Sequence, residues 1–465
     1  MVLLAHLCLA SAGADPVDRI VMTEMQRQYS PGIAVAVVKN GRPVKVAGYG
    51  LANVELQAKV TPTTFFQTAS MGKQFTATLV LLLVNDGKLK LDDTLSTYLP
   101  NAPPAWHSIT IRQLLSHTSG LATTDAAIDL RKDYTEDELL ASAYKVPLSS
   151  APGEKWAYSN LGYQILGIIC SRVGGRFYGD LLRDRLFIPS GMDARIISER
   201  DIVPGRASGY DRYDGVLTNQ EWVSPTMNST ADGSYYVSAR DMARWAVVLD
   251  GDKVLTPSMK EAMWTRATLN SGKHWDYGFG WELSFLDGRR SVRHRGDWQG
   301  FTSYILHFPD DRLTITVLMN RSHGRPHVLA DKLAALYIPA LRGALRVPPS
   351  AATLLKTPIY IQLTMKDGRA MTPLRSNEPG LFEATLPLMQ GMNEFRILSD
   401  DEKTISFGAF TDELVTKPDE LKNLEFEGED FFMQLDAPGR YTFKFDARKA
   451  RKPTLVVRAQ TTPTR

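Results

Sequence analysis

The feature that most constrains the fold is a helical segment, from about residue 70 to residue 85, with apolar side chains on nearly every side. These are Phe75, Ala77, Leu79, Val80, Leu81, Leu82, Leu83 and Val84. Asp86-Gly87 follows the segment, and glycine readily adopts the left-handed conformation that ends a helix. Because a helix without a polar face is buried on all sides, other elements must surround this one in a layered domain.

Length and composition agree with a globular protein whose surface faces water. Of 465 residues, 43% are hydrophobic and 23% are charged, which excludes a disordered chain, a coiled coil and a collagen-like fibre. At about 150 residues per domain, the length favours two or three domains. The net charge is +3 and no run of five Lys or Arg occurs, so we expect no nucleic-acid partner. The longest later apolar run, residues 79–84, is too short to be a membrane span, which needs about 20 residues.

The N-terminus resembles a secretory signal. An apolar stretch over residues 2–10 precedes the small residues Ser11-Ala-Gly-Ala14, so residues 1–15 are predicted to be a signal peptide and the protein to be exported, periplasmic or secreted. No Lys or Arg precedes the stretch and His6 interrupts it, so a buried helix or a misplaced start codon are the alternatives. Removal of the signal would leave Cys170 as a single thiol in an apolar setting, which is typical of a core residue.

Strand-like segments at both ends of residues 16–345 flank a helical middle. Asn40-Gly41 predicts a tight hairpin turn within residues 33–55, because both residues tolerate positive φ. Three antiparallel strands and a closing helix are predicted later, at residues 289–294, 302–308, 313–319 and 328–341. The expected fold class is α+β, with an antiparallel sheet flanked by helices and an all-helical subdomain.

The sequence changes character near residue 347. Apolar residues then alternate with a period of two, as at Ile359, Ile361 and Leu363, and turn signals recur between such runs. Residues 346–465 are therefore predicted to form a small all-β domain, a sandwich or a barrel.

Ser70-Met-Gly-Lys73 is the sharpest chemical signal, at the start of the apolar helix. The spacing places the hydroxyl and the amine one turn apart on the same face. Backbone N–H groups at a helix N-terminus stabilise an oxyanion, and a buried lysine loses its proton more easily than a solvated one. The alternative is an N-capping serine beside a solvated lysine.

Tyr158-Ser-Asn160 lies between a loop and a predicted helix. A phenol near Ser70 and Lys73 relays a proton between nucleophile and leaving group, and the Asn160 amide binds Lys73 and a substrate carbonyl. The alternative is a plain helix N-cap, which Ser and Asn both favour.

His294-Arg-Gly296 lies on a predicted strand. Gly296 allows a substrate backbone to approach the strand edge, and the backbone N–H of Asp297 is the candidate second oxyanion donor beside that of Ser70. The alternative is a solvent-edge strand with an incidental histidine.

Together, in this order and separation, the three motifs resemble the serine β-lactamase and penicillin-binding-protein superfamily, and most closely its branch of class C β-lactamases, DD-peptidases and esterases. Supporting stretches lie at residues 114–121, 152–163, 166–169, 189–192, 238–245, 277–281 and 300–301. The resemblance implies that Ser70 is the acylated nucleophile and that Lys73 and Tyr158 handle its proton. It also implies that His294 takes the place of the lysine in the usual K-T-G triplet. His117, in a segment that is structural in the family, is expected to serve packing.

Several positions depart from the family pattern. His294 replaces a permanent cation that holds a drug carboxylate, and Arg295 is expected to face away from it. Trp298 is a candidate substrate-binding residue that narrows the acyl pocket. These departures favour an esterase or a D-amino-acid peptidase, with weak or no β-lactamase activity.

The expected partner is therefore a small ester, amide or D-amino-acid peptide substrate. No cofactor and no metal are expected, because no His, Cys and acidic cluster has ligand spacing. The alternative function is a binding protein: a penicillin-binding sensor without efficient turnover, or a glycan-binding protein that uses the C-terminal domain. The sequence leaves the oligomeric state open.

Overall fold

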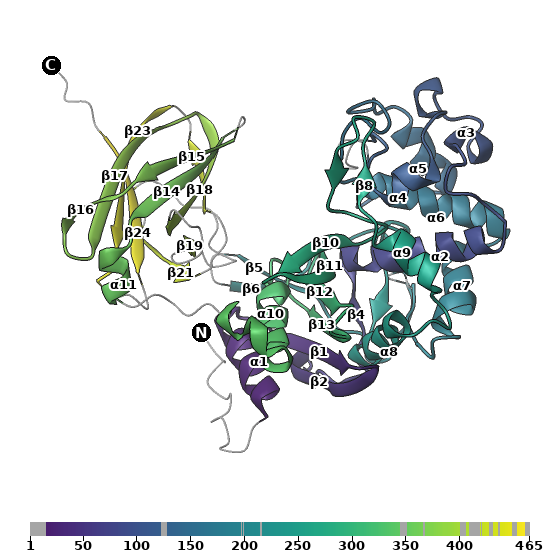
Figure 1. The fold of residues 1–465 in the computed structure, drawn as a ribbon, viewed down its shortest axis with the longest axis horizontal. Coiled ribbons are helices and arrows are strands. Elements are labelled where there is room, and N and C mark those ends of the chain that lie inside the picture. The colour runs from purple at the N-terminus through teal and green to yellow at the C-terminus, as the bar shows by residue number, and fades with distance from the viewer. Residues whose placement is uncertain are drawn as a thin grey trace. The chain divides into compact units, whose positions relative to one another are not determined.

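The computed structural model describes residues 15–460, apart from residues 122–127, 197, 199, 214–215, 345–350, 366–367, 400–405, 409–418, 420, 427–430, 436–437 and 449–452. The predicted signal peptide therefore lies outside the described residues except for Asp15. The chain divides into two compact units (Figure 1). The first unit comprises residues Met1–Asp211 and Thr218–Leu345, and the second comprises Arg212–Leu217 and Arg346–Arg465.

A seven-stranded antiparallel sheet, in the order β10-β11-β12-β13-β1-β2-β3, forms the centre of the first unit. Its strands are β1 (Gly32–Lys39), β2 (Arg42–Asn53), β3 (Ala58–Lys59), β10 (Glu282–Leu286), β11 (Arg289–Trp298), β12 (Phe301–Phe308) and β13 (Leu313–Met319). Asn40 and Gly41 have φ values of 53° and 69°, as the predicted hairpin turn requires. Because β1 pairs with β13, segments from both ends of the unit form one sheet, and the α+β prediction is confirmed.

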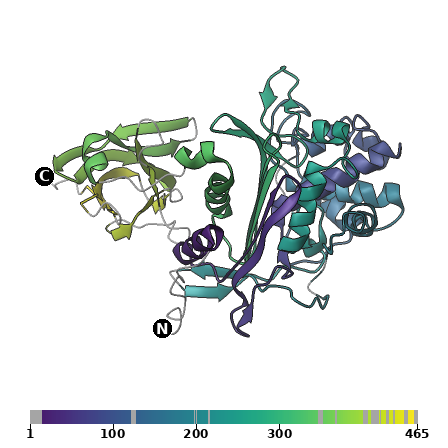
Figure 2. The same cartoon turned by 60° about the horizontal axis from the view of Figure 1, so that its bottom comes forward.

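Helices cover both faces of this sheet (Figure 2). The bounds in the first unit are α1 (Pro16–Arg27), α2 (Lys73–Asn85), α3 (Leu95–Tyr98), α4 (Ile111–Leu115), α5 (Glu136–Ala143), α6 (Asn160–Gly174), α7 (Tyr178–Leu182), α8 (Ala239–Asp250), α9 (Pro257–Met263) and α10 (Pro326–Tyr337). α1 and α10 contact one face, and α8 contacts the other. α10 is shorter than predicted, because Pro339 has no backbone N–H and its ring clashes with the preceding helical turn.

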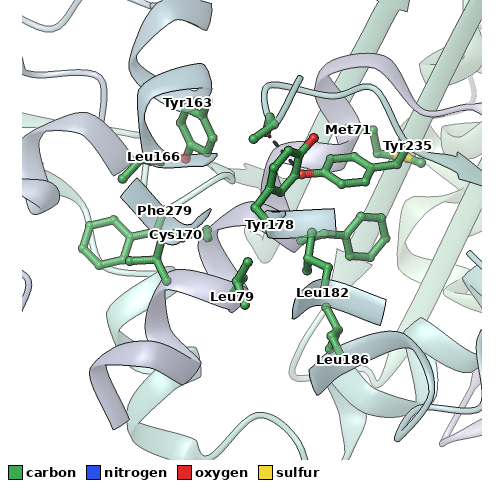
Figure 3. Close-up of a cluster of buried hydrophobic side chains, with 14 of the residues drawn as sticks. Met71, Leu79, Tyr163, Leu166, Cys170, Tyr178, Leu182, Leu186, Tyr235 and Phe279 are labelled. Atoms are coloured by element: carbon green, nitrogen blue, oxygen red, sulfur yellow. Dashed lines mark hydrogen bonds between the residues drawn. The ribbon is translucent and has the colours of Figure 1, made fainter. Parts of the chain in front are cut away.

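α2 is buried along its length, as its apolar surface predicts. It packs against α6 and α7, and Figure 3 shows Leu79, Cys170 and Leu182 from these three helices in one cluster. Burial raises the pKa of the Cys170 thiol to about 12, which suits a core residue. The helix differs from the prediction at its start, since Ser70 lies in a 3₁₀ turn, Ala69–Gly72, and the α-helix begins at Lys73.

The second unit contains two antiparallel sheets, in the orders β15-β14-β18-β19-β21, with β22 also on β18, and β16-β17-β23-β24-β20. Their bounds are β14 (Ile359–Met365), β15 (Gly368–Pro373), β16 (Arg375–Glu378), β17 (Leu381–Leu388), β18 (Gly391–Ser399), β19 (Ser406–Gly408), β20 (Leu421–Asn423), β21 (Glu425–Phe426), β22 (Phe431–Leu435), β23 (Gly439–Asp446) and β24 (Thr454–Ala459). Ile361 and Ile397 of one sheet share a buried core with Phe443 and Phe445 of the other. Two sheets that enclose one core form a sandwich, so the predicted sandwich is confirmed, but the unit is not purely β, because helix α11 (Ala351–Lys356) adds Leu354 to the same core.

The remaining strands and the last α-helix are short. They are β4 (Phe66–Gln67), β5 (Tyr210–Tyr213), β6 (Val216–Asn219), β7 (Tyr236–Val237), β8 (Ala267–Thr268), β9 (His274–Trp275) and α11 (Ala351–Lys356). Among the described residues, no helix is long and apolar enough to span a bilayer.

Candidate active site

The Ser70 hydroxyl and the Lys73 amine meet at the start of α2. Ser70 is half-buried in the 3₁₀ turn, and Lys73 is fully buried, with 0% of its surface exposed. Lys73 Nζ lies 2.9 Å from Ser70 Oγ. The alternative interpretation of this motif, a capping serine beside a solvated lysine, is therefore wrong.

Two further groups bind the amine of Lys73. Nζ donates to Asn160 Oδ1 at 2.8 Å and to the backbone carbonyl of Asp232 at 2.6 Å. Both oxygens can only accept, so they take two N–H groups, and a neutral amine then turns its lone pair toward Ser70. Burial lowers the pKa of Lys73 to about 7, although the Asp232 carboxylate acts in the opposite direction. The amine can therefore accept the proton of Ser70 near neutral pH.

Tyr158 and Asn160 are positioned by the start of α6. Ser159 is the N-cap, and its hydroxyl accepts from the Gly162 backbone N–H at 3.2 Å. The N-cap interpretation thus holds for Ser159, while its two neighbours reach the site. Lys73 Nζ lies 4.9 Å from the centre of the Tyr158 ring. Burial raises the pKa of Tyr158, and a hydrogen bond with Ser70 opposes that shift, so the phenol keeps its proton at neutral pH.

β11 passes directly beside the turn that holds Ser70. A Cβ on Gly296 would lie 2.1 Å from the Thr68 carbonyl oxygen and 3.0 Å from the Met71 nitrogen. Only glycine permits this approach of two backbones. The approach brings the end of β11, with the backbone of Asp297, to the nucleophile segment.

The side chains of β11 separate onto two faces. His294 is buried, and its ring centroid lies 6.3 Å from that of Tyr158. Arg295 instead binds the Asp297 carboxylate through two hydrogen bonds, of 2.6 and 2.8 Å. Because alternate strand residues point to opposite faces, Arg295 does not supply a cation on the His294 side. Burial and the charge of Lys73 lower the pKa of His294 to about 3, so its imidazole is neutral.

Two more glycines shape the site, although the sequence analysis assigned neither of them a role there and noted Gly280 only within the supporting stretch 277–281. A Cβ on Gly233, at φ +154°, would lie 2.2 Å from the Ala69 carbonyl oxygen and 2.8 Å from the Ser70 nitrogen. A Cβ on Gly280, at φ +74°, would lie 2.8 Å from the Lys73 carbonyl. Glycine alone gives no signal of such contacts, because they join segments far apart in the sequence.

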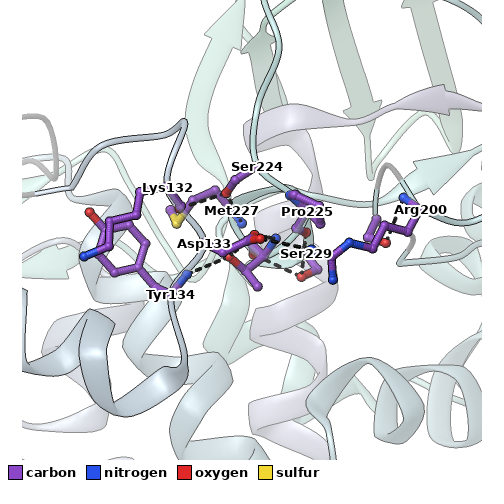
Figure 4. Close-up of polar contacts among 10 residues, drawn as sticks. Lys132, Asp133, Tyr134, Arg200, Ser224, Pro225, Met227 and Ser229 are labelled. Carbon is purple, nitrogen blue, oxygen red and sulfur yellow. Dashed lines mark hydrogen bonds and ion pairs between the residues drawn. The ribbon is translucent and has the colours of Figure 1, made fainter.

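The loop that supplies Asn228 and Asp232 is held by a polar network (Figure 4). Asp133 accepts hydrogen bonds from the backbone N–H and the hydroxyl of Thr226, at 3.1 and 3.0 Å. Asn228 Oδ1 in turn accepts from Trp298 Nε1 at 3.2 Å, which fixes the indole near the end of β11. Asn228 was not predicted, since its role depends on this loop geometry.

A family model described as Beta-lactamase matches residues 17–338. The chain belongs to the beta-lactamase family. Penicillin-binding protein 4* of Bacillus subtilis is 29% identical over 62% of this chain and 68% of its own length. A D-aminopeptidase of Gluconobacter oxydans is 30% identical over 71% of this chain and 62% of its own length.

Solved structures show the same fold. The structure of an octameric penicillin-binding protein homologue from Pyrococcus abyssi aligns with 94% of this chain and with 99% of its own length. The TM-score is 0.64 and the sequences are 22% identical. The D-amino acid amidase of Ochrobactrum anthropi covers 71% of this chain and 98% of its own, with a TM-score of 0.61 and 23% identity. This member of the beta-lactamase family is a hydrolase.

Proposed function

We propose that this protein is a serine hydrolase that forms an acyl-enzyme on Ser70 and acts on carboxylic esters or on peptides and amides of D-amino acids. The observation that carries the proposal is the buried Lys73 amine, which Asn160 and the Asp232 carbonyl hold against the Ser70 hydroxyl. Among the relatives, the D-aminopeptidase and the D-amino acid amidase support the D-amino-acid substrate class.

In the proposed reaction, Ser70 Oγ attacks the substrate carbonyl carbon while Lys73 Nζ takes its proton. The oxyanion that forms accepts from the backbone N–H groups of Ser70 and Asp297. Tyr158, protonated at neutral pH, gives its proton to the leaving alcohol or amine as the bond to the carbonyl carbon breaks, and the Lys73 ammonium then reprotonates it. Water attacks the acyl-enzyme in the second half, with the same groups moving the proton in reverse.

A neutral His294 disfavours substrates that depend on a carboxylate. An uncharged imidazole forms no ion pair, and Arg295 is held on the other face of β11 by Asp297. We therefore propose weak or no β-lactamase activity. The proposed export of the protein depends on residues 1–14, outside the described residues, and stays a prediction.

The test is a comparison of nitrocefin, p-nitrophenyl butyrate and the D- and L-alanine p-nitroanilides, with intact-mass detection of the adduct. We expect turnover of the ester or of the D-anilide, little turnover of nitrocefin, and an acyl adduct that maps to Ser70. Ser70→Ala should lower turnover by about 10⁴-fold or more and abolish the adduct. Ser376→Ala, the same change at an exposed serine of the second unit, should leave both unchanged. Full activity of Ser70→Ala would refute the proposal.

A further inference from the structure

A chain of hydrogen bonds links the motif Tyr158-Ser-Asn160 to the motif His294-Arg-Gly296. It passes through His117 and Tyr277, which the proposed reaction does not use. The backbone N–H of Ser159 donates to His117 Nδ1 at 3.1 Å. His117 Nε2 lies 3.2 Å from the Tyr277 hydroxyl, which lies 2.8 Å from His294 Nε2. His294 Nδ1 lies 2.6 Å from the carbonyl oxygen of Arg295.

The backbone at the two ends fixes the direction of every bond. A backbone N–H only donates, so His117 Nδ1 is the acceptor and its neutral ring carries its proton on Nε2. A carbonyl only accepts, so His294 carries its proton on Nδ1 and leaves Nε2 bare. The Tyr277 hydroxyl therefore accepts from His117 and donates to His294. One arrangement of protons satisfies the whole chain.

Burial keeps both imidazoles in this neutral state. His117, Tyr277 and His294 expose only 1%, 2% and 2% of their surfaces. Burial and the nearby charge of Lys73 lower the pKa of both histidines. The other titratable groups that face the hydrogen-bonded residues are Tyr158, Glu282 and Tyr163, which is itself hydrogen-bonded to Tyr277. The phenols stay protonated because burial raises their pKa values.

The rings of these hydrogen-bonded residues also lie around Tyr158. The ring of His117 lies 4.3 Å from the Tyr158 ring, and those of Tyr277 and His294 lie 6.4 and 6.3 Å from it, measured between centroids. Ser159, where the chain begins, is the neighbour of Tyr158 in the sequence. The three rings thus lie next to the ring of the proposed proton donor.

We propose that His117 and Tyr277 are positioning residues. They hold His294 as the Nδ1–H tautomer, with its Nε2 lone pair accepting a hydrogen bond, and they keep the Tyr158 ring in place beside β11. The effect on turnover rests on the proposed function, whereas the state of His294 does not. His117 is thereby more than the packing residue that its segment suggests.

The deciding variant is Tyr277→Phe, which removes the hydroxyl and keeps the ring. In protein labelled with ¹⁵N-histidine, we expect the His294 Nε2 signal, assigned by its loss in His294→Gln, to show a bare nitrogen that accepts a hydrogen bond. In Tyr277→Phe that signal should move downfield, toward an unbonded nitrogen. With the ester substrate, kcat should fall roughly tenfold, the value of one hydrogen bond, while KM changes by less than about twofold.

Tyr210→Phe is the matched control, because its hydroxyl also accepts one hydrogen bond, from the Val54 backbone N–H at 2.7 Å, and donates one, to Glu55 Oε2 at 2.5 Å, outside the hydrogen-bonded chain. It should destabilise the protein without moving the His294 signal or kcat. If Tyr277→Phe does not fold, His117→Asn, which tolerates the φ of +58° at this position, should shift the same signal in the same direction by less. An unchanged His294 signal in the folded variant would overturn the proposal. Absence of turnover in the parent protein would refute the proposed function alone.

Discussion

Lys73 places a titratable amine where water is excluded, and its chemistry follows from that position. Because only the uncharged amine accepts the Ser70 proton, kcat/KM for an ester should be low below pH 7 and rise to a plateau above it. The midpoint should lie near the pKa of about 7. A pH–rate profile with a p-nitrophenyl ester, corrected for hydrolysis without enzyme, measures this. Lys73→Arg keeps its charge throughout the range and should lose activity at every pH. A flat profile from pH 5 to about 9 would contradict the assignment of the base.

At the scale of elements, the close approach of β11 to the turn Ala69–Gly72 decides whether the site is assembled. Gly296→Ala would place a methyl group 2.1 Å from the Thr68 carbonyl oxygen, so one backbone must move. We expect a loss of about 1–3 kcal/mol in the free energy of unfolding and roughly 100-fold in kcat. Gly87→Ala, with open space around its Cβ and a φ of +71°, is the control. It should cost about 1–2 kcal/mol of stability and leave kcat unchanged. Wild-type kcat in Gly296→Ala would show that the approach is not needed.

At the scale of the whole molecule, the two units share no buried apolar cluster among the described residues, which predicts two unfolding transitions. Phe443→Ala empties a fully buried position in the sandwich and should destabilise one transition by about 3–5 kcal/mol. Leu79→Ala, at an equally buried position in α2, should instead lower the other transition, by about 2–5 kcal/mol. Differential scanning calorimetry of the full chain, followed by ester hydrolysis after heating, assigns each transition to its unit. A single transition that both variants shift equally would contradict two independent cores.

The sequence by itself determined the two kinds of domain, the buried helix and the residues of the three motifs, because periodicity and short spacings are local properties of the chain. Only the tertiary structure decided how the site is assembled. The acceptor at Asp232 is a backbone carbonyl, which every residue possesses, and the contacts of Gly296 and Tyr277 join segments that are distant in sequence. The protonation states of Lys73 and His294 follow from burial, which depends on everything that packs around them.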